Sequence, residues 1–294
     1  MLSRCAFFLI CVRAAALLLV VPPIGLAAND VTSSTEAQQK ALSDARKIAP
    51  AGFTALIQPP FIVVGDESPA KVRQRAESTV KWTVDRLKQD FFANDPDEVI
   101  TIWLFKDRPS YETNTRQLFH EAHPSPYGYY SPRARALIMN ISTGAGTLVH
   151  EIVHPYIRTN FPKCPAWFNE GLGSLFEACE DRDGHIRGLP NWRLPGLQKV
   201  IRESHTLPFE EFTAMSDTDF YGGSSGYNQH YGQARYLCYY LQEHGLLINF
   251  YREFLAHATD DPTGFRSLKK ILKTDDMADF QRKWEAFVLK LHDP

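Results

Sequence analysis

The sequence predicts an α+β fold in which a small mixed sheet with helices is followed by a mainly helical half. Apolar runs of the kind that form buried strands occur only up to residue 141. After that point the apolar residues recur three and four positions apart, which is typical of helices. With 44% hydrophobic and 22% charged residues in 294, the chain can bury a sizeable core. Disorder and a small disulfide-stapled scaffold are therefore excluded.

Residues 1–27 have the layout of a secretory signal peptide. Arg4 and Arg13 precede an apolar run that two prolines end well short of the ~20 residues that span a membrane. Small residues follow, so we expect cleavage after Ala27 or Ala28. The mature protein would then be exported, to the periplasm or outside the cell, and would have no stable membrane span. The alternative is an uncleaved anchor, which would place Arg13 in the bilayer.

The remainder of the chain is expected to form a strand-rich part, 28–141, and a helical part, 142–294. Strands are predicted at 61–64, 99–105, 127–130 and 136–141, the last two as a hairpin. Helices are predicted before residue 54 and at 72–91, 111–119, 147–159, 165–178, 196–203, 231–244, 247–256, 263–272 and 277–291. The Gly/Ser/Asp-rich stretch 215–228 is predicted to be a loop, and Gly222 to Gly226 could cover a cleft or be inert.

Charge and cysteine content narrow the partners and the redox state. Lys and Arg number 32 against 34 Asp and Glu, a net charge of −2, so nucleic acid is not expected as the main partner. Three cysteines remain after the signal: Cys164, Cys179 and Cys238. This odd number leaves at least one thiol unpaired in an oxidising compartment. Cys164 and Cys179 are close enough in sequence for a local bridge, but the connectivity stays open.

Residues 150–154 read His-Glu-Ile-Val-His, an H-E-x-x-H pattern. Because residues four apart share one face of a helix, His150 and His154 can bind one metal ion. Glu151 then lies to one side, where a carboxylate can act as a general base. The pattern alone is only moderately specific, and a helix that happens to carry two histidines is the alternative.

Catalytic zinc usually has three protein ligands, so a third ligand should follow. Glu170 comes sixteen residues after His154, in the first turns of a helix that begins beyond Pro165. Two helices joined by a short turn can face each other across one ion. Glu177, two helical turns further along the same face, is the rival third ligand.

These motifs carry a resemblance to a known family. The segment 137–177, with its H-E-x-x-H and Trp-Phe-Asn-Glu-Gly-Leu sequences, resembles the gluzincin zinc metallopeptidases and is most similar to the exported bacterial peptidase MA-like families. The resemblance implies a zincin-like fold and one Zn²⁺ held by His150, His154 and Glu170, with Glu177 in a supporting role. It also implies that Glu151 is the general base for hydrolysis of a peptide or protein substrate.

Two further implications concern substrate binding. In this family the edge strand before the metal helix pairs with extended substrate, which here would be 136–141. The Tyr-Gly-Gln sequence that begins at Tyr231 is similar to a family helix that packs behind the site. We therefore expect Tyr231 to donate a hydrogen bond to the oxyanion, with His230 and Tyr227 as the next candidates.

The sequence departs from related classes in ways that limit the activity. Metzincins require glycine and histidine where this chain has Ile157 and Asn160. The chain also lacks the motif by which aminopeptidases of the clan hold a free amino terminus, so exopeptidase action is not supported. Zinc-dependent peptide hydrolysis is the leading hypothesis. The alternatives are a catalytically silent binding protein with the same fold and a zinc hydrolase of a non-peptide substrate.

Overall fold

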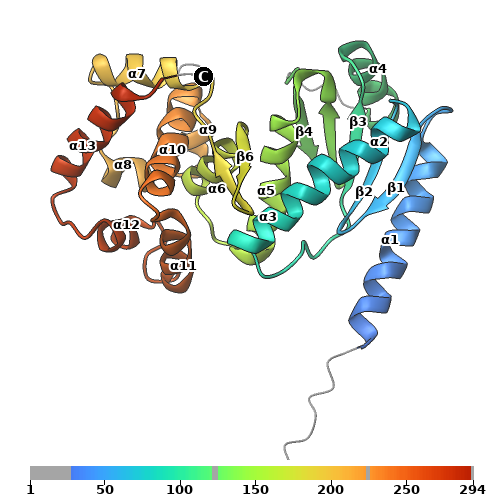
Figure 1. Cartoon of the computed structure of the whole chain (residues 1–294), viewed down its shortest axis with the longest axis horizontal. Coiled ribbons are helices and arrows are strands. Elements are labelled where there is room, and N and C mark those ends of the chain that lie inside the picture. The colour runs from blue at the N-terminus through green and yellow to red at the C-terminus, as the bar shows by residue number, and fades with distance from the viewer. Residues whose placement is uncertain (1–27, 121–124, 223–225, 293–294) are drawn as a thin grey trace, which may run out of the picture.

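The computed structural model describes residues 28–120, 125–222 and 226–292. Its first half is built on a five-stranded mixed sheet (Figure 1). The strands are β1 (Thr54–Gln58), β2 (Phe61–Gly65), β3 (Thr101–Phe105), β4 (Gly128–Ser131) and β5 (Ala136–Asn140). The order is β1-β2-β3-β5-β4, with β2, β3 and β5 parallel and the two outer strands antiparallel to their neighbours. The predicted α+β class with a small mixed sheet is confirmed, whereas the predicted signal segment lies outside the described residues.

The strand that precedes the H-E-x-x-H helix is not at the edge of the sheet. β5 pairs with β3 on one side and with β4 on the other, so that Ile138 lies opposite both Trp103 and Tyr129. The prediction that 136–141 is an edge strand is therefore wrong, and among the described residues β4 occupies that edge. The physical reason is that all five residues of β5 are buried, which suits a strand with covered faces and neighbours on both sides.

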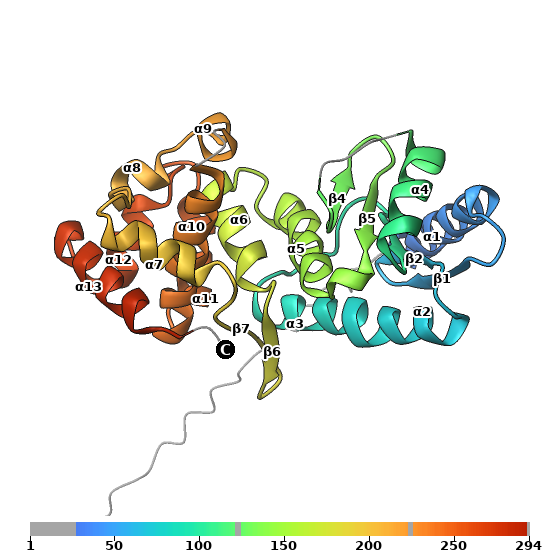
Figure 2. The ribbon, with the colours of Figure 1, turned by 90° about the horizontal axis from the view of Figure 1, so that it is seen from above.

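Both faces of the sheet are covered by helices, so the first half has three layers (Figure 2). One face packs against a continuous helical run, α2 (Pro69–Arg75), the π-helical segment Ala76–Lys81 and α3 (Trp82–Asp90), and against α5 (Gly146–Asn160). The other face packs against α1 (Ala28–Ile48) and α4 (Arg108–Phe119). Successive strand residues alternate between these two cores. Val63 and Ile102 belong to the first, and Ile62 and Trp103 belong to the second.

Helices α5 (Gly146–Asn160) and α6 (Ala166–Leu175) lie beside each other, between the sheet and the helices of the second half of the chain (Figures 1 and 2). α5 continues through Pro155 and ends at Asn160. Pro165 occupies the N-cap position of α6, where its fixed φ and its missing N–H are tolerated. The short connection makes the two helices neighbours, as their sequence spacing predicted.

The second half is mainly helical, as predicted, but it contains elements that the sequence did not reveal. The helices are α7 (Leu194–Arg202), α8 (Phe209–Thr213), α9 (Asp217–Tyr221), α10 (Gly226–Glu243), α11 (Leu247–His257), α12 (Phe265–Leu272) and α13 (Met277–Lys290). A hairpin of β6 (Cys179–Arg182) and β7 (His185–Gly188) follows α6. The predicted helix 165–178 was too long, since α6 ends at Leu175. The predicted loop 215–228 includes α9 and the start of α10.

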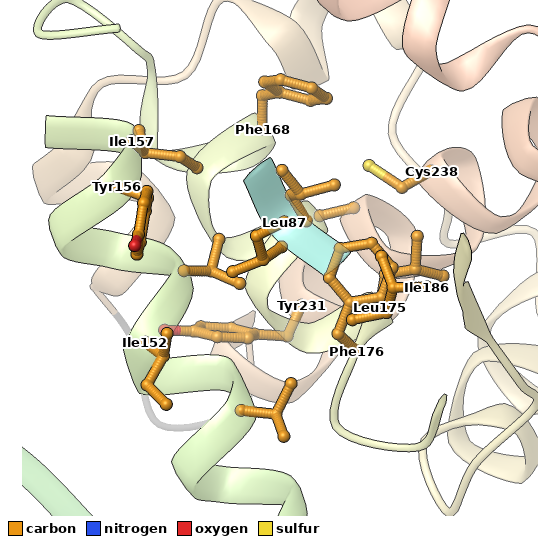
Figure 3. Close-up of a cluster of buried hydrophobic side chains, with 14 of the residues drawn as sticks. Leu87, Ile152, Tyr156, Ile157, Phe168, Leu175, Phe176, Ile186, Tyr231 and Cys238 are labelled. Atoms are coloured by element: carbon orange, nitrogen blue, oxygen red, sulfur yellow. The ribbon is translucent and has the colours of Figure 1, made fainter. Parts of the chain in front are cut away.

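One hydrophobic cluster runs from the sheet through α5 and α6 to the C-terminal helix. Leu87 of α3, Ile152 of α5 and Phe176 lie in it together with Tyr231 of α10 (Figure 3). Trp284 of α13 belongs to the same cluster. The two halves of the chain therefore share this cluster, and α5 and α6 are packed on both sides.

Two sequence expectations concern membranes and thiols. Among the described residues no helix is both long and apolar enough to cross a membrane. Cys164, Cys179 and Cys238 are all free thiols, so the local bridge that the spacing allowed is not formed. Burial raises the pKa of the Cys179 thiol to about 12, which keeps it in the unreactive protonated form.

Candidate metal centre

Helices α5 and α6 bring together His150, His154 and Glu170. One donor atom from each residue lies within 4.8 Å of the others. Oε2 of Glu170 is 3.1 Å from Nε2 of His150 and 3.8 Å from Nε2 of His154. His150 and Glu170 are buried, with 7% and 6% of their surface exposed. Two imidazoles and a carboxylate are a donor set that suits zinc.

The other end of each of these side chains is held by a separate residue. Nδ1 of His150 lies 3.1 Å from Oε1 of Glu177, and Nδ1 of His154 lies 2.9 Å from Oδ1 of Asn169. An Nδ1–H that donates to these oxygens leaves Nε2 of each imidazole as the ligand atom.

Oε1 of Glu170 is held in the same way, since it accepts a hydrogen bond of 2.7 Å from the hydroxyl of Tyr221. The three candidate ligand atoms therefore point to one place because the opposite ends of their side chains are anchored. These hydrogen bonds form without a metal ion, and the donor atoms that they orient are close enough together to bind one ion.

Glu177 does not belong to the group of three ligand atoms. Arg193 donates to both of its oxygens, over 3.0 and 2.8 Å, and Asn191 donates to Oε2 over 3.2 Å. Such a bidentate pair fixes the carboxylate plane. Glu177 thus bridges Arg193 to His150. Of the two third ligands that the sequence left open, the geometry favours Glu170.

The charges within the group are strongly coupled. Burial alone would lower the pKa of His150, but hydrogen bonds to Glu170 and Glu177 outweigh it and raise the pKa to about 10. Burial would raise the pKa of Glu170, yet His154, His150 and Tyr221 lower it to about 2. The pKa of Glu177 is also lowered well below its ordinary range, against its burial, by His150 and Arg193. Without a metal, the two carboxylates hold a proton on His150 at neutral pH.

Two glycines mark close contacts at this centre, one of α6 against the ring of His150 and one of α5 against the backbone of Glu177. A Cβ atom at Gly173 of α6 would lie 3.1 Å from Nε2 and Cδ2 of the His150 ring. A Cβ atom at Gly146, at the start of α5, would meet the backbone oxygen of Glu177 at 2.0 Å. Gly146 therefore permits a backbone approach that any larger residue would prevent, whereas a methyl group at Gly173 would require the ring of His150 to shift by a few tenths of an ångström.

Glu151 lies beside the group of three on α5 and is half-buried. Its charge contributes to the raised pKa of Tyr111, about 12, after burial and Glu112. The carboxylate is thus near enough to Tyr111 of α4 to act on it electrostatically. Glu151 directly follows His150 in the sequence and is not among the three residues of the candidate metal group. Its role as general base stays a prediction.

Tyr231 is 5% exposed and packs in the core between α10 and its neighbours (Figure 3). Its ring contacts Phe220, with 5.4 Å between ring centroids, and lies 5.0 Å from the guanidinium carbon of Arg193. His230 directs Nδ1 to the backbone oxygen of Phe220 at 3.1 Å. The side chain of Tyr227 lies outside the described residues.

Four supporting residues were not predicted from the sequence: Asn169, Tyr221, Asn191 and Arg193. Asn169 could have been found, because it directly precedes Glu170 on the same helix. The other three come from segments after α6, and no periodic pattern links them to the H-E-x-x-H motif. Tyr221 in particular lies in a stretch whose composition predicted a loop.

Comparison with known proteins shows a distant likeness in fold. No protein-family model matches the chain, and no curated protein matches it. Among solved structures, it is similar to yeast LTA4 hydrolase in complex with bestatin, at a TM-score of 0.42 and 14% sequence identity. The match covers 82% of this chain and 40% of that one, so this chain spans about two fifths of the other protein. A likeness at this level does not identify the activity.

Proposed function

We propose that this protein is a zinc-dependent hydrolase that cleaves peptide bonds. The observation that carries the proposal is the anchored convergence of Nε2 of His150, Nε2 of His154 and Oε2 of Glu170 in a buried position. A structural zinc site is normally closed by four protein ligands, whereas catalytic sites have three and an open position. Three side chains, with a further carboxylate adjacent, favour the catalytic type.

Each residue of the site would have a distinct chemical role. His150, His154 and Glu170 would hold Zn²⁺, which supplies Lewis acidity and lowers the pKa of a water towards ~7. Glu151 would accept the proton of the attacking water and return it to the leaving amine. Tyr231 would donate its phenolic hydrogen to the substrate oxygen that becomes negatively charged.

A peptide substrate is supported by the position of β4 at the edge of the sheet. Among the described residues no strand pairs with the outer side of β4, which leaves that side for pairing with an extended substrate chain. β4 lies beside α5: Arg158 donates to the hydroxyl of Tyr130 over 3.2 Å and its guanidinium lies 4.9 Å from that ring. We therefore assign to β4 the pairing role that the sequence had suggested for 136–141.

The decisive test compares the parent protein with Glu151→Gln. Both should retain zinc, measured by atomic absorption after dialysis, because Glu151 lies outside the ligand set. Cleavage of a peptide library, followed by mass spectrometry, should be lost or reduced roughly 10²–10⁴-fold in the variant. Equal cleavage by the two proteins would refute the proposed mechanism.

The same measurements separate the alternatives. Zinc bound by the parent without cleavage of any peptide would favour a binding protein that has kept the fold. Cleavage of a non-peptide ester or amide, lost in Glu151→Gln while peptides remain intact, would favour a hydrolase of another substrate class. Absence of metal from the parent after reconstitution would refute the metal centre itself.

A further inference from the structure

The two carboxylate oxygens of Glu170 face different partners. Oε2 faces the histidines, at 3.1 and 3.8 Å from their Nε2 atoms. Oε1 accepts the hydrogen bond from Tyr221 at 2.7 Å. Glu170 itself is 6% exposed, whereas Tyr221 is 43% exposed. A solvent-exposed tyrosine therefore holds one oxygen of a buried carboxylate.

The chain around Tyr221 is built to hold it in this position. Phe220 is fully buried, and its ring packs against those of Tyr221 and Tyr231, with 5.4 Å between centroids in each pair. Ser216 caps the start of α9 through a bond from the backbone N–H of Asp219. Tyr221 is thus the last residue of an anchored turn.

We infer that Tyr221 is a positioning residue that restricts Glu170 to binding the metal through Oε2 alone. This inference rests on the proposed zinc site. A carboxylate can bind a metal through one oxygen or both. The hydrogen bond from Tyr221 to Oε1 holds the carboxylate in the orientation in which Oε2 faces both histidines, so Oε2 is the oxygen presented to the ion. The hydroxyl acts through Glu170 and need not touch substrate.

Binding through one oxygen would leave a coordination position of the metal open for water. With one oxygen of Glu170 and two imidazoles as ligands, a zinc ion has three protein donors and keeps a position open for water. A second oxygen from Glu170 would occupy space that the water and the substrate carbonyl need. Partners behind the ligands typically change metal affinity or activity by 10–100-fold when they are removed. Tyr221 would thus tune the number of ligands rather than supply one.

The test is Tyr221→Phe, which removes the hydroxyl and keeps the ring that packs on Phe220. The parent and the variant are loaded with Zn²⁺ for X-ray absorption and with Co²⁺ for visible spectroscopy. We expect the variant to gain about one ligand and to show the weaker visible absorption of a Co²⁺ ion with more ligands. Peptide cleavage should fall roughly 10–100-fold in kcat with little change in KM.

Tyr240→Phe is the matched control, because Tyr240 stacks on His244, at 4.0 Å between ring centroids, away from the metal centre. It should match the parent in every measurement. If Tyr221→Phe binds metal with the same spectra as the parent, the inference is overturned while the proposed function stands. If the parent binds no metal, the proposed function falls and takes the inference with it.

Discussion

Nδ1 of His150 lies 3.1 Å from Oε1 of Glu177, on the opposite side of the imidazole from Glu170. Glu177 is itself clamped by Arg193. The first histidine of the H-E-x-x-H motif is therefore oriented by a carboxylate that does not belong to the ligand set. In metal sites, such a partner fixes the tautomer of a histidine ligand and raises its basicity.

Glu177→Gln should weaken zinc binding by roughly 10–100-fold while the protein stays folded. The amide keeps the shape of the side chain but removes its negative charge. His150 then loses an anionic partner, and Arg193 loses its ion pair. Competition with a chromophoric chelator measures the affinity. The matched control is Glu243→Gln, which breaks a 2.8 Å pair with Arg187 elsewhere. Equal affinities for all three proteins would contradict the orienting role.

Zinc binding should release a proton from His150. Its pKa in the metal-free protein is raised to about 10, so at pH 7 the metal must displace that proton. Apparent affinity should then rise about tenfold per pH unit between pH 6 and 8. Titration calorimetry in buffers of different ionisation enthalpy counts the protons directly. No dependence on buffer or pH would show that His150 is already neutral.

The metal-free protein should also lose stability at high pH. The pKa of His150 is raised above its ordinary value of 6.5 to about 10, so its ion pairs stabilise the fold fully below about pH 6.5. That contribution is lost as the pH rises through 10. Thermal unfolding of chelator-treated protein at pH 7 and pH 10 measures the effect. Zinc-loaded protein is the control and should lose less, because the ion replaces the proton.

How far the sequence led to the site can be judged from its individual residues. His150, His154 and Glu170 were predictable because spacing on two helices joined by a short turn brings them together. Glu177 was identified as a candidate, but its pairing with Arg193 depends on the hairpin β6–β7 that places the following segment. Tyr221 was not found, since nothing local connects it with Glu170.

The fold was predictable to a similar extent and for similar reasons. Strands with continuous apolar residues, such as 61–64, were recognised. β1, whose five residues are all only half-buried, was missed. The order of strands depends on crossovers between distant segments, so the edge position of β4 could not be read from its local sequence.

Tyr231→Phe tests the predicted contact with the substrate oxygen. If the hydroxyl stabilises the developing charge, kcat should fall roughly 10²–10³-fold with zinc content unchanged. Steady-state kinetics on a cleaved peptide, together with metal analysis, provides the measurement. Tyr240→Phe again serves as the control. A variant as active as the parent would show that Tyr231 is purely a core residue, consistent with its 5% exposure.

Gly173→Ala should separate stability from metal binding. Alanine is favoured over glycine inside a helix by roughly 1 kcal/mol, but the new methyl group would lie 3.1 Å from Nε2 of His150. The ring must shift by a few tenths of an ångström, which moves the ligand atom away from the other two donors. We therefore expect zinc affinity to fall severalfold in chelator competition, even if the metal-free protein melts no lower than the parent.

Gly196→Ala on α7 is the control, since nothing lies within 4 Å of its added Cβ. It should stabilise the helix and leave the affinity unchanged, and equal affinities for Gly173→Ala and Gly196→Ala would show that the ring of His150 can yield without cost.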